Sequence, residues 1–482
     1  MVNAFSSASE LAAAIRLRRV SAAEVTQMYL ARIAAHNPAL NAVVTLDEAG
    51  ARARAAQADA ALGRGELWGP LHGVPMTIKD ALETAGMRTT GGHPPLANYV
   101  PKRDATAVAR LRAAGAVLLG KTNLPPLSAD YRADNEIFGR TNNPWDLSRT
   151  PGGSTGGGAA AVAAGLSAFD VGSDLAASVR LPAHYCGVFG LKATEHRIPN
   201  TGHIPEPPGL ARAVRHLNVL GPLARSVEDL WAILKVIAGA DGIEWDVPPV
   251  PLVEPPAREL RTMRFAWSTD FGGLPVTRDT KTAIEALATA LSRLGCRVEN
   301  RLPPKFDLNT AWELWGEIVI AERAATAPER VAERVAALKA TLGGHPLGVG
   351  SAKGATATLA DYMTALTRRD ELVTGLESFF DDFDALLCPV TVSPAIPHVP
   401  YGTPIDVDGK QVPYFLAGTA YTTPFNLSGS PVVVLPLARS QDGLPIGVQV
   451  VGRRWSEPAL LAAAAKLALV TGPFTPPPGF AA

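Results

Sequence analysis

Short apolar runs recur along this chain, and their length and borders predict buried β-strands. Each run is bounded by Gly or Pro and is partly β-branched, which is typical of strands covered on both faces. The runs are Val74 to Ile78, Ala116 to Leu119, Leu386 to Cys388, Pro431 to Leu435 and Ile446 to Val451. Because helical segments lie between them, we expect an α/β fold.

Two capping boxes near the start predict a pair of N-terminal helices. Ser7 with Glu10, and Ser21 with Glu24, fit the spacing S-x-x-E. In this arrangement the side chains satisfy the free amides at a helix start. The helices are expected at about 8 to 17 and 22 to 36.

A further helical pattern lies in the second half of the chain. Apolar residues recur there at i, i+3, i+4, i+7 and i+10, namely Ile284, Leu287, Ala288, Leu291 and Leu294. This helix lies between the strand-like segments Arg264 to Trp267 and Arg297 to Asn300, and we expect the unit to be a peripheral insertion. The proline- and acid-rich connector Asp241 to Pro256 precedes it and is expected to be an ordered surface loop or a short linker.

The charge balance limits the classes of binding partner. The 482 residues carry 45 Lys+Arg and 45 Asp+Glu, so the formal net charge is zero. This balance gives no electrostatic footprint for nucleic acid or for an anionic membrane surface, and it fits a small, largely neutral substrate.

Length alone suggests about three domains of ~150 residues, and a hydrophobic fraction of 47% is ample for a large core.

Cysteine usage and the chain start indicate a cytoplasmic protein. Cys186, Cys296 and Cys388 form no CxxC spacing, which argues against a disulfide framework or a zinc site. No signal-peptide pattern and no run of about 18 apolar residues occurs, so we expect neither a signal peptide nor a membrane span. Nine histidines show no metal-binding pair, and residues 151–158 lack the GK[ST] ending of a phosphate loop. We expect no metal and no cofactor.

Three blocks carry the candidate chemistry, and together they resemble the amidase signature family. They are GVPMTIKD with Lys79, PGGSTGGG with Ser154, and SDLAASVRLPAHYCGVFGLKAT with Ser178. The two serines are separated by 178 − 154 = 24 residues, which is the interval of that family. Four further segments appear in the family's order: GKTN, GRTNNPWD, GPLARSVEDL and DGLPIGVQVVG.

The resemblance implies one large domain with a central mixed β-sheet covered by helices on both faces. It overrides the domain count suggested by length. We expect this single amidase domain to span 1–482. Its parts are an N-terminal helical segment (1–65), a catalytic core with the three site residues (66–240), a peripheral insertion and helices (241–345), and a C-terminal completion of the core (346–482).

Lys79 is the candidate base. It follows a run that reads as an interior strand, where a charged side chain is either functional or awkwardly buried. An ordinary lysine, with a pKa of about 10.4, is almost entirely protonated at pH 7, but desolvation that lowers the pKa by ~3 units makes a substantial fraction neutral. A neutral amine takes up a proton from a hydroxyl nucleophile.

The resemblance assigns the remaining catalytic roles. It implies that Ser178 is the nucleophile, that the Gly153–Ser154 peptide bond is cis, and that Ser154 relays a proton to Lys79. Backbone amides at the turn before a helix suit a developing oxyanion, and the candidate donors are Leu175, Ala176, Ala177 and Ser178. Asp174 and Arg180 match charged family positions and are expected to hold this loop from behind, by pairing with the backbone or with each other.

The chain departs from the family pattern at two places. Ala176 and Ala177 stand where relatives usually carry two glycines, and we predict negative φ at both, since positive φ strains an alanine. Pro126 stands where relatives often carry an acidic residue, and it receives no catalytic role. Trp312 and Trp315 lie at helical spacing, which fits the core better than a substrate channel.

These observations predict an amidohydrolase that cleaves a small carboxamide, anilide or carbamate (aryl-acylamidase or urethanase activity), acting as a monomer or homodimer. Three alternatives stay open. The motif G-x-S-x-G at 152–156 fits an α/β-hydrolase-type esterase using Ser154, although the preceding segment is loop-like. The chain also fits an amidase-like subunit of a tRNA-dependent amidotransferase, although the residues from His196 onward do not resemble that subunit. The third alternative is a non-catalytic binding protein.

Overall fold

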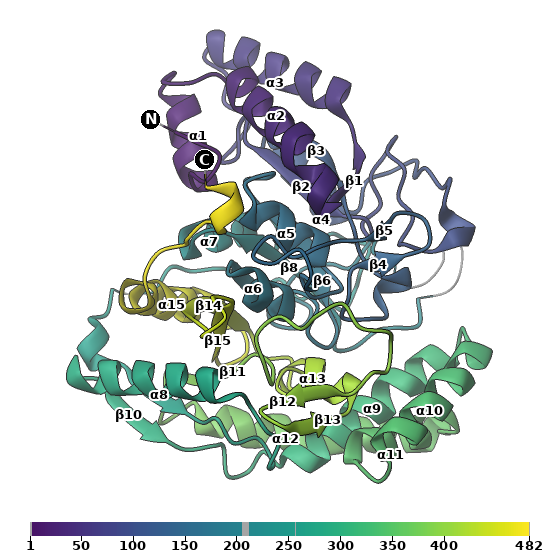
Figure 1. Ribbon diagram of the computed structural model, residues 1–482. Coiled ribbons are helices and arrows are strands. Elements are labelled where there is room, and N and C mark those ends of the chain that lie inside the picture. The colour runs from purple at the N-terminus through teal and green to yellow at the C-terminus, as the bar shows by residue number, and fades with distance from the viewer. Residues whose placement is uncertain (1, 205–211, 256, 482) are drawn as a thin grey trace.

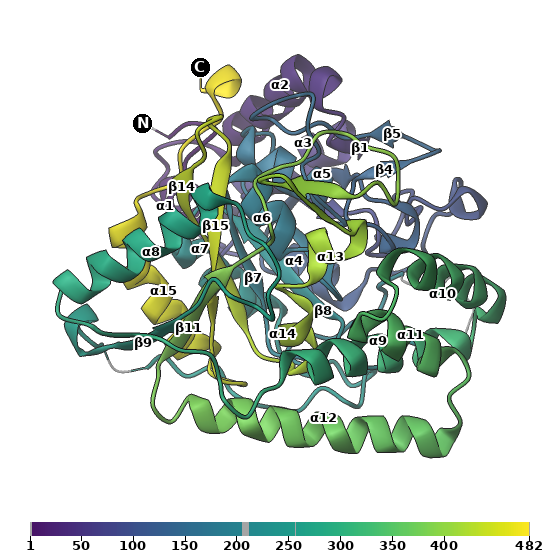
Figure 2. The same cartoon turned by 60° about the horizontal axis from the view of Figure 1, so that its bottom comes forward.

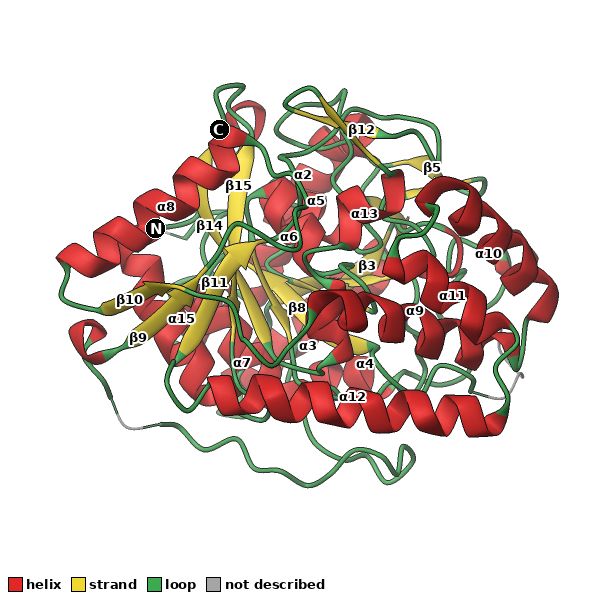
Figure 3. Cartoon of the chain, turned by 90° about the horizontal axis from the view of Figure 1, so that it is seen from below, coloured by secondary structure: helices red, strands yellow, loops and turns green. Residues whose placement is uncertain are grey.

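A large mixed sheet runs through the molecule (Figures 1 and 3). The structure, a computed structural model, describes residues 2–204, 212–255 and 257–481. Within these ranges the 11-stranded sheet has the order β1-β3-β2-β6-β8-β7-β14-β15-β11-β9-β10. Its strands are β1 (Val43–Leu46), β2 (Pro75–Lys79), β3 (Val117–Thr122), β6 (Asp170–Asp174), β7 (Phe189–Lys192), β8 (Val219–Ala224), β9 (Arg264–Trp267), β10 (Arg297–Asn300), β11 (Ala385–Pro389), β14 (Val432–Arg439) and β15 (Pro445–Val451).

The sheet combines parallel and antiparallel neighbours. Strand β2 pairs in parallel with β3 and β6, and β9 pairs in parallel with β10 and β11. The other pairs in the sheet are antiparallel. Two small hairpins lie outside the sheet, formed by β4 (Asp134–Asn135) with β5 (Gly139–Arg140) and by β12 (Ile405–Val407) with β13 (Lys410–Val412).

Helices flank the sheet on either side (Figure 3). They are α1 (Ala8–Arg16), α2 (Ala22–Leu40), α3 (Glu48–Gly63), α4 (Thr106–Ala113), α5 (Gly156–Ala163), α6 (Arg180–Cys186), α7 (Val227–Ile237), α8 (Arg278–Arg293), α9 (Leu308–Ala324), α10 (Pro328–Leu342), α11 (Pro346–Ala355), α12 (Leu359–Phe379), α13 (Tyr414–Thr419), α14 (Thr423–Leu427) and α15 (Glu457–Thr471). Short 3-10 helices span Pro94–Leu96, Pro126–Ser128, Leu260–Thr262 and Pro478–Phe480. Among the described residues, no helix is both long and apolar enough to cross a bilayer. The predicted α/β fold with one large domain is confirmed.

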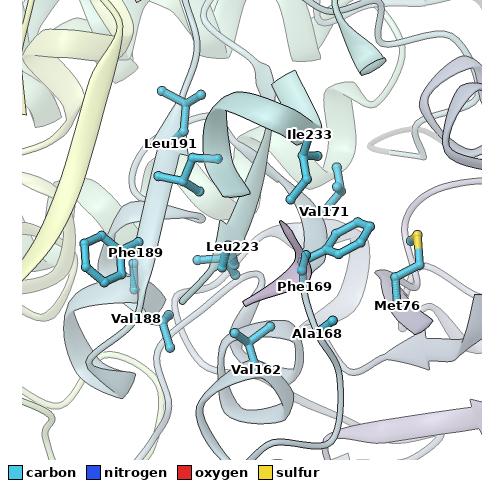
Figure 4. Close-up of a cluster of buried hydrophobic side chains, with 14 of the residues drawn as sticks. Met76, Val162, Ala168, Phe169, Val171, Val188, Phe189, Leu191, Leu223 and Ile233 are labelled. Atoms are coloured by element: carbon cyan, nitrogen blue, oxygen red, sulfur yellow. The ribbon is translucent and has the colours of Figure 1, made fainter. Parts of the chain in front are cut away.

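Two hydrophobic clusters surround the sheet. One packs α5, α7 and α15 on the strands, and Figure 4 shows part of it, with Val162 of α5, Ile233 of α7 and Leu223 of β8 gathered together. The other joins α9, α12, α13 and α14. Of these helices, α9, α12 and α14 lie on the lower side of the molecule in Figure 2. Helix α6 and the residues just before it contribute to both clusters. The segment 175–186 is therefore fixed from two directions.

The predicted strands and N-terminal helices are present, with shifted ends. The five apolar runs correspond to β2, β3, β11, β14 and β15, and both capping boxes form as predicted. Helix α2 ends at Leu40 rather than near residue 36, and it contains Pro38. The Asn37 side chain stabilises this end, because its Oδ1 accepts hydrogen bonds from the backbone amides of Ala42 and Val43.

The unit from 264 to 300 lies at the edge of the main sheet. Strands β9 and β10 have the predicted bounds, and β9 pairs with β11. Four of the five predicted apolar positions on α8 are buried, whereas Leu294 caps the helix and is 51% exposed. The preceding connector, from 241 to 255, contains no helix or strand, and its last predicted residue, Pro256, is outside the described residues.

Candidate active site

Lys79 lies at the end of β2 with its side chain completely buried. Its Nζ is 2.5 Å from the Oγ of Ser154 and 3.0 Å from the Oγ of Ser173. The pairing of β2 with β6 explains the second contact, because it aligns Ile78 with Val171 and so brings the ends of the two strands together. The sheet thus places an amine against two hydroxyls that come from distant parts of the sequence.

Burial changes the proton affinity of Lys79. Desolvation lowers the pKa of Lys79 to about 7, against the opposing attraction of Asp174 and Asp170. Burial also raises the pKa of the Asp170 carboxyl to about 7. Near neutral pH, a large fraction of the Lys79 amine is therefore unprotonated and able to accept a proton.

Ser154 sits in the loop just before α5 and is fully buried. The Gly153–Ser154 peptide bond is cis, as the resemblance implies. A side chain at residue 153 would bring its Cβ within 2.6 Å of the Tyr131 backbone and 2.8 Å of the Arg132 backbone, so this position requires glycine. The amide of Thr155 donates to the carbonyl oxygen of Ser178 at 3.1 Å and joins this loop to the loop of the second serine.

Ser178 lies between β6 and α6 and is 9% exposed. It lines a pocket together with the three residues before it. Within the described residues, no protein acceptor takes a hydrogen bond from the backbone amides of Leu175, Ala176, Ala177 or Ser178. Successive amides of this kind suit a developing negative charge. Neither Ala176 nor Ala177 has a positive φ, so that prediction is confirmed.

A buried ion pair supports this turn. Arg180 Nη2 lies 2.8 Å from Asp174 Oδ1, and both side chains are inaccessible to solvent. Asp174 Oδ2 also accepts the amide of Val179 at 3.0 Å. Burial pushes the pKa of Asp174 upward, but the Arg180 charge and the hydrogen bonds outweigh it and lower the pKa to about 2. The carboxylate stays charged and fixes the start of α6.

The hydroxyls of Ser154 and Ser178 are not hydrogen-bonded to each other within the described residues. Ser178 lines the pocket, whereas Ser154 Oγ contacts Lys79. The relay between the two hydroxyls therefore stays a prediction. In the same described ranges, no group of three or more His, Cys, Asp or Glu residues is arranged to hold a metal ion.

The pocket holds about 520 Å³ of space between atoms, including its opening. Its walls come from residues 128–131, the turn 175–178, α9, α10 and α13. Trp315 lines it and donates its Nε1 hydrogen to the carbonyl oxygen of Leu175 at 3.1 Å. Trp312 instead lies in the core and donates to the carbonyl oxygen of Ala420 at 2.9 Å. The core interpretation thus holds for both tryptophans, since both are buried in the same hydrophobic cluster, and Trp315 in addition lines the pocket.

Sequence reasoning missed two features of the site. Ser173 directly precedes Asp174 within the third block, but nothing in the sequence indicated that it contacts Lys79. The pocket walls from α9, α10 and α13 also carried no motif. Pro126 is exposed and begins the short 3-10 helix that ends at Ser128, a pocket residue.

An α/β fold of this topology with these serines and a buried lysine is typical of amidase-type hydrolases. The Amidase family model matches residues 24–461, and the chain belongs to this family. The α/β-hydrolase alternative is thereby removed, and no strand directly precedes Ser154.

Several characterised proteins are similar over nearly their full length. The chain is 35% identical over 466 residues to a glutamyl-tRNA(Gln) amidotransferase subunit of Roseiflexus castenholzii, covering 92% of this chain and 91% of the relative. It is 36% identical over 466 residues to indoleacetamide hydrolase of Bradyrhizobium diazoefficiens, covering 96% of this chain and 86% of the relative. The structure of 6-aminohexanoate cyclic dimer hydrolase complexed with substrate matches with a TM-score of 0.80 and 29% identity, covering 99% of this chain and 100% of that chain.

Proposed function

We propose that this protein is an amidohydrolase that cleaves the C–N bond of a small carboxamide, anilide or carbamate through an acyl-Ser178 intermediate. The observation that carries the proposal is the buried Lys79 amine, with a pKa lowered to about 7, 2.5 Å from the Ser154 hydroxyl. Ser178 lines the pocket with the backbone amides of residues 175–178, which have no protein acceptor among the described residues, and its carbonyl oxygen accepts the amide of Thr155 next to Ser154.

The proposed reaction has two halves. In the first, Ser178 Oγ attacks the carbonyl carbon while its proton passes through Ser154 to Lys79, and the amides of residues 175–178 stabilise the oxyanion. The proton then returns to the nitrogen, the C–N bond breaks, and the amine leaves. In the second half, water attacks the acyl-enzyme by the same proton path. The acid is released and Ser178 recovers its proton.

The relatives support an amide substrate and leave its identity open. Indoleacetamide hydrolase and 6-aminohexanoate cyclic dimer hydrolase are both named for amide substrates. The zero formal charge of the chain and the aromatic pocket walls fit a small organic amide. The proposal includes independent action as a monomer or homodimer, without nucleic acid or membrane, and a cytoplasmic location. The three free cysteines are consistent with that location.

The test combines covalent labelling with a substrate panel. A fluorophosphonate probe followed by peptide mapping is expected to modify Ser178, and S178A is expected to remove both labelling and turnover. Chromogenic anilides, primary amides, carbamates and esters then define the substrate class. Labelling at Ser154, or amide turnover that persists in S178A, contradicts the proposal.

A second candidate function is that of an amidotransferase subunit. The 35% identity to the amidotransferase relative from Roseiflexus castenholzii favours it. The segment that argued against it, His196 to Gly209, lies partly outside the described residues. Glutaminase activity together with co-purification of partner subunits is the expected result for this candidate. Amide hydrolysis by the isolated chain, with no glutaminase activity, excludes it.

A further inference from the structure

Among the residues that the structure describes, three charged side chains line the proposed substrate pocket: Asp130, Arg323 and Arg334. The negative charge of Asp130 is compensated by Arg132, because Asp130 Oδ2 accepts a hydrogen bond from Arg132 Nε at 2.7 Å in an ion pair. Its Oδ1 also accepts from the Tyr414 hydroxyl at 2.8 Å. The positive charge that Arg334 brings to the pocket is therefore not cancelled by Asp130.

Arg334 on α10 has unused hydrogen-bonding capacity. Its Nη1 donates one hydrogen bond, at 3.3 Å, to the backbone carbonyl of Ala129. Its guanidinium lies 5.4 Å from the centre of the Phe415 ring. Among the described residues, no carboxylate forms an ion pair with it. Because a guanidinium carries five N–H donors, most of them stay available to a ligand.

We propose that Arg334 binds an anionic group, foremost a carboxylate, on the part of the substrate remote from the scissile amide. The inference rests on the proposed function, since it takes Ser178 as the position of the scissile carbonyl. Arg334 and Ser178 line the same pocket, so a substrate of suitable length is able to contact both. Arginine matches a carboxylate with two parallel hydrogen bonds, and the Phe415 ring holds the guanidinium plane in place.

The competing interpretation is a structural role, in which Arg334 only packs on Phe415 and ties α10 to Ala129. In that case the loss of Arg334 changes kcat/KM by the same factor for charged and neutral substrates. A role in recognition instead changes the ratio between anionic and neutral substrates. The decisive quantity is therefore the ratio of kcat/KM for a charged substrate to kcat/KM for its neutral match.

Two matched substrate pairs locate the anionic group. The first pair places the carboxylate on the acyl side. It compares the mono-4-nitroanilide of succinic acid, which is charged, with the 4-nitroanilide of valeric acid, which is neutral. The second pair places the carboxylate on the amine side. It compares 4-acetamidobenzoate, which is charged, with 4-methylacetanilide, which is neutral. We expect the charged member of at least one pair to have a kcat/KM about 10-fold higher or more, as a charge-assisted hydrogen bond provides.

Arg334→Gln is expected to lower that ratio by at least about 10-fold, and Arg334→Glu to invert the preference. The matched control is Arg330→Gln, because Arg330 lies on the same helix, is exposed and does not line the pocket. This control is expected to keep the ratio of the native protein. Raising the salt concentration is expected to shrink the preference in the native protein.

The outcomes separate the two proposals. Equal kcat/KM within both pairs, or a ratio that Arg334→Gln leaves unchanged, overturns the role of Arg334 while amide hydrolysis stands. Absence of turnover for all four amides in the native protein contradicts the proposed function first and removes the basis of this inference with it.

Discussion

Two buried lysines at the ends of neighbouring strands, Lys79 on β2 and Lys121 on β3, differ in what their amines contact. Both side chains are inaccessible to solvent, and burial lowers the pKa of Lys79 to about 7 and that of Lys121 to about 8. Lys79 contacts the hydroxyls of Ser154 and Ser173, and neither hydroxyl donates a hydrogen bond elsewhere in the described structure. These hydroxyls are free to act as donors or acceptors.

Lys121 is surrounded by acceptors. Its Nζ donates to the carbonyl oxygen of Leu82 and to the hydroxyl oxygens of Thr84, at 2.8 Å, and Thr89, at 3.2 Å. The protons of both threonines are already donated, to the carbonyl oxygens of Leu82 and Met87. Three acceptors match the three protons of an ammonium group, so Lys121 is held charged. Burial alone does not make a lysine a base, because its partners decide which proton state is stable.

The largest expected effect is the contrast in activity between two single variants. Lys79→Met is expected to lower kcat by at least ~10³-fold, because general base catalysis is lost. Lys121→Met is expected to lower kcat by less than about 10-fold, because it supports the fold rather than the reaction. Assays with a chromogenic anilide measure both, and thermal melting verifies that each variant is folded. Equal losses in the two variants contradict the contrast.

The second expected effect concerns stability. Lys121→Met leaves three buried acceptors and the nearby Asp80 carboxyl without their cation, and we expect a loss of roughly 3 kcal/mol in the free energy of unfolding. Lys79→Met leaves two hydroxyls that are able to bond to each other or to water, so its loss is expected to stay below ~1 kcal/mol. Urea denaturation monitored by fluorescence compares the two. A larger loss in Lys79→Met refutes the structural role of Lys121.

The third expected effect is the pH dependence of kcat/KM. The base acts only when neutral, and its pKa in the folded protein is lowered to about 7. Activity is therefore expected to be full above pH 8, to halve near pH 7, and to fall about tenfold for each further unit of acidity. A buffer series on one anilide measures this profile. A midpoint near pH 10, where an ordinary lysine titrates, is incompatible with the proposed base.

The smallest expected effect comes from Ser173. Ser173→Ala removes one of the two hydroxyls at Lys79 but keeps Ser154, so kcat is expected to fall by about 10-fold or less. Ser154→Ala removes the proposed relay and is expected to cost more than about 100-fold. Rates for the two variants under saturating substrate decide the order. The reverse order assigns the relay to Ser173.

Much of the fold was readable in the sequence, because most strands in the sheet interior are continuous apolar runs with Gly or Pro at their ends. Strands β1, β6, β7 and β8 of the main sheet were not predicted, and β6 was missed because its sequence, DVGSD, carries two aspartates. Strand β6 is nevertheless buried, because both carboxyl groups have partners in the folded chain: Asp170 Oδ2 accepts a hydrogen bond from Thr77 at 2.7 Å, and Asp174 pairs with Arg180. Such compensation depends on tertiary contacts that a local pattern does not contain.

The residues of the site also fall into two groups, those that a local motif predicted and those that only tertiary contacts bring together. Lys79, Ser154 and Ser178 were found because they lie in compact motifs at fixed spacing. The contact of Ser173 with Lys79 and the pocket wall from α9, α10 and α13 were not found, because they arise where the strands pair and where distant helices pack. Trp315 illustrates the limit: its helical spacing indicated burial correctly but not which side of the helix meets the pocket.

The central claim is that the buried amine of Lys79 is neutral under working conditions. NMR titration of ¹⁵N-labelled lysine side chains tests it most directly. The Lys79 resonance is assigned by its absence in the Lys79→Met variant. We predict a resonance that titrates near pH 7 and disappears in that variant. A Lys79 resonance that stays in the ammonium form up to pH 10 contradicts the account.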